Sequence, residues 1–255
     1  MENIFPDEDW EPAQPSSDAE LWRYIDFTQF VSILENEALW LSRAAGFFDS
    51  YEGALPPPKL EEIAEGVSDR VSNPEQVVRA FYEALRFSTY VSCWHEAEEE
   101  TAAMWQIYQE KGKEVAVKTT VSRFENAITS GSDIVSGQVE YIDYSNTLDI
   151  TVSRVSPFFF KRESFRPESE FRAVISDFEP PDGVRIDDGF SNKVAAKSDP
   201  GRPVALDPSL LIEEVYISPV AGNWLEGLVD DVLDKYDLED VPVHPSSLDK
   251  DPFEG

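Results

Sequence analysis

The segment that most constrains the fold runs from Phe158 to Ile175 and reads FFFKRESFRPESEFRAVI. Charged and apolar residues alternate in it from Glu168 onward. Such alternation predicts a β-strand that places Glu168, Glu170 and Arg172 on one face. A face of this kind is either a solvent-exposed row of salt bridges or the wall of a site, because charges are costly to bury. We interpret it as the wall of a site.

Composition bounds the class of protein. The chain has 255 residues, of which 41% are hydrophobic and 12% aromatic, so we expect a globular protein with a sizeable core. It carries 51 Asp and Glu against 21 Lys and Arg, for a formal net charge of −30. Self-repulsion on this scale destabilises a compact state in dilute salt, and molar salt screens it. We therefore expect that the protein works in the cytoplasm of a halophile. We expect no continuous basic surface that could bind a nucleic-acid duplex.

Other compositional features exclude several kinds of site. The single cysteine, Cys93, excludes an internal disulfide and a cysteine zinc cluster. No apolar run approaches the roughly 20 residues that cross a bilayer. The first residues, MENIFPDEDW, are acidic and unlike a targeting signal. These features predict a cytoplasmic protein that does not enter a membrane.

Sequence periodicity predicts a single mixed α+β domain in which helices separate the strands. Strands are expected at 21–25, 39–42, 89–94, 114–119, 136–143, 168–175 and 212–217. Helices are expected after a cap at Asp26 or Thr28, over 60–85 with a break at Asn73-Pro74, and over 102–108, 121–128 and 224–236.

Three parts of the chain are predicted from these elements. Residues 1–19 form an acidic arm, either disordered or laid on the domain as a strap through Phe5 and Trp10. Residues 20–236 form the domain, and residues 237–255 form an acidic tail.

Several stretches together resemble a prokaryotic family known as domain of unknown function 2971. They are LWRYIDFTQFVSILENEALWLS, the loop FFDSYEG, YVSCW with AAMWQIY, and FKRESFRPESEFR. The family's pattern is similar in order, and the match covers most of residues 20–220. The family name implies no activity.

The opening LWRYIDFTQFVSIL and the middle TYVSCW with MWQIY are also similar, more distantly, to DarT-type ADP-ribosyltransferase toxins. That resemblance implies an ADP-ribosyltransferase-like split β-sheet core flanked by helices, with NAD as cofactor and no metal. DarT proteins have a histidine on the first strand, where this chain has Arg23. The order Arg23, Ser92 and Glu170 instead resembles the other large class of ADP-ribosyltransferases.

The resemblance implies a role for each candidate residue. Glu170 stabilises the oxocarbenium-like cation that forms when the nicotinamide–ribose bond breaks, and Glu168 orients or deprotonates the acceptor. The implied cofactor-binding residues are Arg23 for the pyrophosphate or ribose, Ser92 for the ribose, Tyr51 or Trp105 for stacking on nicotinamide, and also Tyr24 and Arg172.

Each candidate also has a purely structural interpretation. Arg23, between Trp22 and Tyr24, is equally typical of a cation on an edge strand with aromatic neighbours. Ser92 suits a small residue in the core, and Trp105 suits a core position. Asp49 and Glu52 are turn residues by default, whereas the family resemblance implies that their loop belongs to the site.

Three functions remain open from the sequence. The first is an ADP-ribosyltransferase acting on a macromolecular acceptor (DNA, RNA or protein), as a toxin or anti-phage defence effector with an antitoxin or defence-system partner. The second is a metal-dependent nuclease of a defence system built on Glu168, Glu170 and Lys161. The third is a non-catalytic binding or regulatory protein on the same scaffold.

Overall fold

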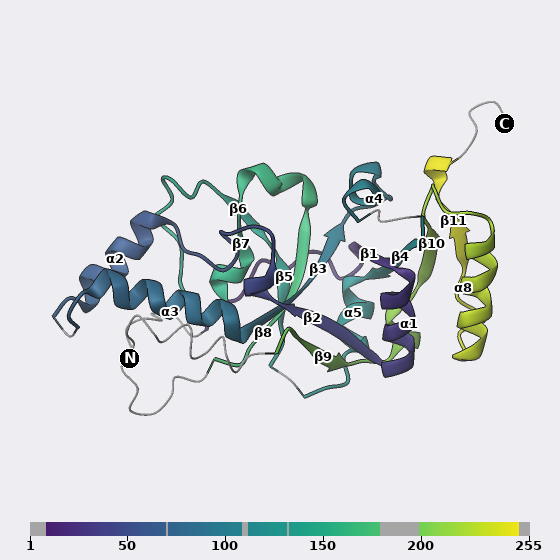
Figure 1. Ribbon diagram of the computed structural model, residues 1–255, viewed down its shortest axis with the longest axis horizontal. Coiled ribbons are helices and arrows are strands. Elements are labelled where there is room, and N and C mark those ends of the chain that lie inside the picture. The colour runs from purple at the N-terminus through teal and green to yellow at the C-terminus, as the bar shows by residue number, and fades with distance from the viewer. Residues whose placement is uncertain (1–8, 70, 109–111, 132, 179–198, 250–255) are drawn as a thin grey trace. The chain divides into compact units, whose positions relative to one another are not determined.

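A computed structural model of the protein describes residues 9–69, 71–108, 112–131, 133–178 and 199–249 (Figure 1). The chain divides into two compact units. The first comprises Met1–Gln14, Leu41–Ser92 and Ser132–Arg202, and the second comprises Pro15–Trp40, Cys93–Gly131 and Pro203–Gly255. Each unit contains mostly antiparallel strands and helices that flank them, so the predicted mixed α+β class is confirmed.

The first unit contains the candidate site. In it β3 pairs with β2 and β8, and β8 also pairs with β5, while β6 and β7 form a separate parallel pair. These strands are β2 (Ala38–Arg43), β3 (Thr89–Glu96), β5 (Val135–Gln138), β6 (Glu140–Ile142), β7 (Phe160–Arg162) and β8 (Glu170–Ser176). Residues 38–40 of β2 and 93–96 of β3 belong to the second unit. Helices α2 (Pro57–Val67) and α3 (Pro74–Ser88) lie side by side (Figure 1). Three short 3₁₀ helices complete it, η1 (Ala44–Gly46), η2 (Ser156–Phe159) and η3 (Glu163–Glu168).

The second unit orders its strands β11-β10-β4-β1-β3. Its strands are β1 (Glu20–Asp26), β4 (Glu114–Thr120), β10 (Glu214–Ile217), β11 (Val243–Pro245) and most of β9 (Gly201–Ala205). Its helices are α1 (Phe27–Asn36), α4 (Ala102–Tyr108), α5 (Val121–Ala127), α7 (Pro208–Leu211), α8 (Trp224–Lys235) and η4 (Ser247–Asp249). Helix α8 packs beside β11 (Figure 1).

Local sequence explains where two of the helices begin. The Asp26 side chain accepts hydrogen bonds from the backbone N–H groups of Thr28 and Gln29, so Asp26 is the cap of α1. Pro74 occupies the first turn of α3 after Asn73, whose φ of 58° places it in the left-handed region. The helical stretch expected over 60–85 is therefore two helices, α2 and α3.

Two predicted strands need correction. Strand β8 begins at Glu170, because Glu168 ends η3 and Ser169 turns the chain with a left-handed φ of 39°. The strand expected at 136–143 is two strands, since β5 pairs with β8 whereas β6 pairs with β7. The short strands β7, β9 and β11 were not predicted, and β11 lies within the expected tail of residues 237–255.

The N-terminal arm has one described anchor. The ring of Trp10 lies 5.5 Å from that of Phe159 and 6.1 Å from that of Phe160, between centroids. This is the kind of contact expected of a strap, whereas Phe5 lies outside the described residues. Within the described part of the chain, no helix has the length and apolar character that a membrane crossing requires.

Candidate functional site

A fully buried arginine, Arg172, lies at the centre of the candidate site in the first unit. Its Nε donates to Glu170 Oε2 at 2.6 Å. Its Nη1 and Nη2 donate to the two carboxylate oxygens of Glu52 at 2.5 and 3.0 Å, and Nη1 also donates to the Phe158 carbonyl at 2.5 Å. The planar guanidinium thus joins β8 to the loop after β2 and to the segment before β7.

Lys161 supplies the second cation of the cluster. Its Nζ donates to Glu170 Oε1 and to Glu168 Oε2. The Glu170 side chain is 5% exposed and has a cation on each oxygen, whereas the Glu168 side chain is 27% exposed. The two carboxyl groups therefore share one lysine but differ sharply in contact with solvent.

The loop that carries Glu52 is held in a tight turn. The Glu52 N–H donates to the Asp49 carbonyl at 3.1 Å. Gly53 follows with a φ of +69°, and a Cβ there would lie 2.3 Å from the Phe158 ring. Only glycine fits both the left-handed backbone and the close ring, so this turn delivers Glu52 to Arg172.

A second ion pair forms the rim of the cluster. Arg162 Nη2 donates to Asp49 Oδ1 at 2.8 Å. Its guanidinium lies 4.5 Å from the Tyr51 ring centroid and 5.1 Å from that of Phe165. The Tyr51 ring is 39% exposed, so the rim presents a cation between two aromatic faces.

The surroundings of Glu168 and Glu170 shift the pKa values of these two carboxyl groups in opposite directions. Burial alone would raise the pKa of Glu170, but the charges of Arg172 and Lys161 outweigh it and lower that pKa well below 4.5. Burial, assisted by the hydrogen bond with Glu170, raises the pKa of Glu168 to about 7. Burial also raises the pKa of Glu52, and Arg172 opposes that change. One carboxylate thus stays ionised while its neighbour exchanges a proton near neutral pH.

A pair of one ionised and one titrating carboxyl group can support two kinds of catalysis. A carboxylate that remains charged when buried stabilises a developing cation. A partly exposed carboxyl with a pKa near neutral accepts or donates a proton efficiently. The predicted convergence of Glu168, Glu170 and Arg172 is therefore found, although Glu168 reaches it from η3 and not from the strand.

The other predicted residues lie in two places. In the first unit, Ser92 is a buried residue of β3, 1% exposed, and Tyr51 belongs to the rim. In the second unit, Arg23 Nη1 donates to the Cys93 carbonyl at 3.0 Å, and its guanidinium lies 5.5 Å from the Trp94 ring centroid.

Tyr24 and Trp105 belong to an aromatic core of the second unit, whose buried members are Trp22, Tyr24, Met104, Trp105 and Ala116. The rings of Tyr24 and Trp105 meet edge to face at 4.9 Å. Tyr24 and Arg23 are successive residues of β1, and their side chains point to opposite faces of that strand.

Three residues of the cluster were not among the predicted site residues. Glu52 was interpreted as a turn residue by default and as part of a site loop by the family resemblance, but it was given no role. Lys161 was considered only for a nuclease. The Tyr141 hydroxyl accepts the Glu170 N–H at 2.9 Å. The loop FFDSYEG and the basic pair before Glu168 are the sequence signals for the first two, and we find none for Tyr141.

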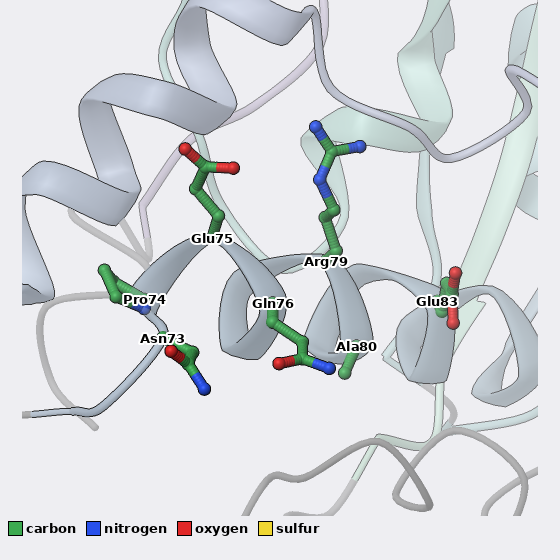
Figure 2. A pocket seen from close by; sticks show the side chains of 7 residues that line it. All are labelled: Asn73, Pro74, Glu75, Gln76, Arg79, Ala80 and Glu83. Carbon is green, nitrogen blue, oxygen red and sulfur yellow. The ribbon is translucent and has the colours of Figure 1, made fainter.

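Two further observations on the described residues concern metal binding and a surface hollow. In the described ranges, no group of three or more His, Cys, Asp or Glu side chains is placed to hold a metal ion. A hollow of about 710 Å³ lies along α3, with Glu75 and Arg79 on one side of the helix and Gln76 and Ala80 on the other (Figure 2). None of its lining residues belongs to the cluster.

The solved structures that resemble this chain include two of DarT from Thermus sp. 2.9. The structure in complex with carba-NAD+ is 10% identical with a TM-score of 0.38, and the match covers 92% of this chain and 98% of that chain. The structure in complex with NAD+ is 8% identical with a TM-score of 0.37, covering 91% and 97%. No family model and no curated protein matches the sequence. The resemblance to domain of unknown function 2971 therefore stays a prediction.

Replacing Arg172 by methionine should destabilise the protein by about 3–5 kcal/mol, because it leaves Glu52 and Glu170 buried without their shared partner. Urea unfolding in molar KCl measures the difference in the free energy of unfolding between Arg172→Met and wild type. The matched control is Arg166→Met, which breaks an exposed pair with Glu163 and should cost less than about 1 kcal/mol. The triple variant Glu52→Gln, Arg172→Met, Glu170→Gln should be more stable than Arg172→Met. Equal stability of Arg172→Met and wild type would contradict a buried ionic cluster.

The pKa of Glu168 predicts a pH dependence. Its folded value of about 7 lies above the ordinary 4.5, so its contribution to stability is full below pH 4.5 and is lost as pH rises towards 7. The free energy of unfolding of Glu168→Gln should therefore equal that of wild type near pH 5. Near pH 8 it should be higher, on the order of 1 kcal/mol after solvent screening at this partly exposed site. The exposed Glu163→Gln serves as control. A Glu168→Gln difference that does not change between pH 5 and pH 8 would contradict the raised pKa.

Proposed function

We propose that this protein is an ADP-ribosyltransferase that uses NAD to modify a macromolecule. The observation that carries the proposal is that Lys161 pairs with both a buried, ionised Glu170 and a partly exposed Glu168. NAD supplies an ADP-ribosyl group whose release from nicotinamide leaves a cationic ribose. The cluster has the charge that this reaction requires close to such a cation.

Each residue of the cluster then has a distinct task. Glu170 places a negative charge beside the developing cation, and its low pKa keeps that charge despite burial. Glu168 takes the proton of the acceptor hydroxyl or amine as that nucleophile attacks, which its pKa of about 7 suits. Lys161 holds the two carboxyl groups together and keeps Glu170 ionised.

Arg172 receives a different role from the one the resemblance implied. Its guanidinium is fully buried and donates to Glu170, Glu52 and a backbone carbonyl. We assign it to positioning Glu170, and we retain Arg23, Tyr24, Tyr51, Ser92 and Trp105 as the proposed NAD-binding residues. A role as a toxin or anti-phage effector in the cytoplasm of a halophile, with an antitoxin or defence-system partner, belongs to the same proposal.

A metal-dependent nuclease is the second candidate. The observation in its favour is that Lys161 contacts both Glu168 and Glu170, which are the residues that the nuclease hypothesis combines. The two candidates differ in the ligand that they require, so a single set of titrations separates them.

The test is a thermal-shift titration with NAD in molar KCl, combined with an assay of nicotinamide release. NAD at about 100 times its dissociation constant should stabilise wild type by roughly 2.7 kcal/mol. Glu170→Gln should keep this binding and lower nicotinamide release by about 10²–10³-fold, whereas Arg23→Ala should abolish binding. Glu163→Gln, which alters an exposed carboxylate, should leave both unchanged.

Two outcomes would contradict the proposal. Stabilisation by Mn²⁺ or Mg²⁺ but not by NAD, lost in Glu168→Gln and Glu170→Gln, would favour the nuclease. Stabilisation by neither ligand would favour a non-catalytic binding protein.

A further inference from the structure

The N-terminal strap, defined as residues 10–14, lies along β5 in the first unit. The Gln138 N–H donates to the Ala13 carbonyl at 2.8 Å, and Gln14 Nε2 donates to the Ser136 carbonyl at 2.6 Å. In the described part of the sheet, β5 has β8 as its one partner strand. The strap therefore occupies the edge of β5 that β8 does not use, and edges of this kind readily accept another strand.

The fit of the strap explains a glycine in β5. A Cβ on Gly137 would lie 2.5 Å from Pro12 Cγ and 2.8 Å from the Ala13 carbonyl oxygen. The φ of Gly137 is not positive, so its backbone conformation would accept an alanine. Close approach of the strap is thus the reason for glycine at this position.

The strap also contacts β7, the strand that carries Lys161 of the site. The Trp10 ring packs on Phe159 and Phe160, and Phe160 directly precedes Lys161. On the β5 side, the residue after Gln138 is Val139, whose N–H donates to the Glu170 carbonyl at 2.9 Å. The strap therefore holds both segments that bring Lys161 and Glu170 together.

Charge opposes the docking of the arm. Residues 1–19 contain six acidic residues and no Lys or Arg, and the whole chain has a formal net charge of −30. The contacts that hold the strap include apolar contact at Trp10 and Pro12 and the hydrogen bonds to β5. Repulsion between like charges is screened within about 3 Å in 1 M salt but extends to about 10 Å in 0.1 M salt.

We propose that the strap is a salt-dependent latch on the candidate site. At high ionic strength it docks on β5 and β7 and keeps Lys161 paired with the two glutamates. At low ionic strength it is released, and the contact between Glu170 and Lys161 loosens. The latch itself rests on the contacts of the strap, and its effect on catalysis rests on the proposed function.

Amide hydrogen exchange resolved by residue tests the latch in the whole protein. Gly137→Ala blocks docking from the strand side, and Trp10→Ala removes the anchor from the strap side. Gly66→Ala is the control, because a Cβ at Gly66 would meet no atom within 4 Å apart from its chain neighbours and the backbone of its own helix. In molar KCl, both blocking variants should exchange the Gln138 and Val139 amides at least about tenfold faster than wild type, while the amides of α3 stay unchanged. Wild type should show the same acceleration in 0.1 M KCl.

Three results would overturn the latch. One is equal acceleration across α3, which means a general loss of stability. Another is acceleration at Gln138 but not at Val139, which means that the strap docks without holding the site. The third is a wild-type Gln138 rate that does not depend on salt beyond the change seen in α3. Failure of NAD to bind while the predicted exchange pattern holds would refute the proposed function and support the latch.

Discussion

The burial of the Arg172 guanidinium against two carboxylates is the interaction on which the candidate site depends. A charge with no exposure is tolerated only when its donors are satisfied, and Arg172 achieves this with Glu170, Glu52 and the Phe158 carbonyl. The loop after β2, the segment before β7 and strand β8 must meet at one point for these bonds to form. The tight turn at Gly53 and the left-handed Ser169 follow from that requirement.

The same cluster creates the functional asymmetry. Arg172 and Lys161 form ion pairs with Glu170 and keep it ionised. Glu168 pairs with Lys161 as well, but its side chain is partly exposed to solvent. In a chain with a formal net charge of −30, Arg172 and Lys161 lie among the carboxyl groups of Glu52, Glu168 and Glu170. The strap adds a further constraint, since it contacts the segments next to Glu170 and Lys161 from outside the cluster.

Sequence patterns predicted the features that depend on neighbours along the chain. Alternation located most strands, Asp26 and Pro74 marked helix starts, and the spacing of Glu168, Glu170 and Arg172 indicated a charged site. Features set by distant partners escaped prediction: Glu52 reaches Arg172 across 120 positions, and β11 forms only because β10 offers it an edge. The position of Glu168 was also missed, because a single left-handed residue takes it out of the strand.

The asymmetry of the pair means that one glutamate stays ionised while the other holds its proton up to neutral pH. Site-resolved ¹³C NMR titration of the side-chain carboxyl groups in molar KCl measures both protonation states in one experiment. Glu170 should remain ionised throughout the acidic range in which the protein stays folded, and Glu168 should titrate near pH 7. If both carboxyl groups titrated near their ordinary 4.5, the two glutamates would be equivalent solvated charges, and the division of roles between them would be wrong.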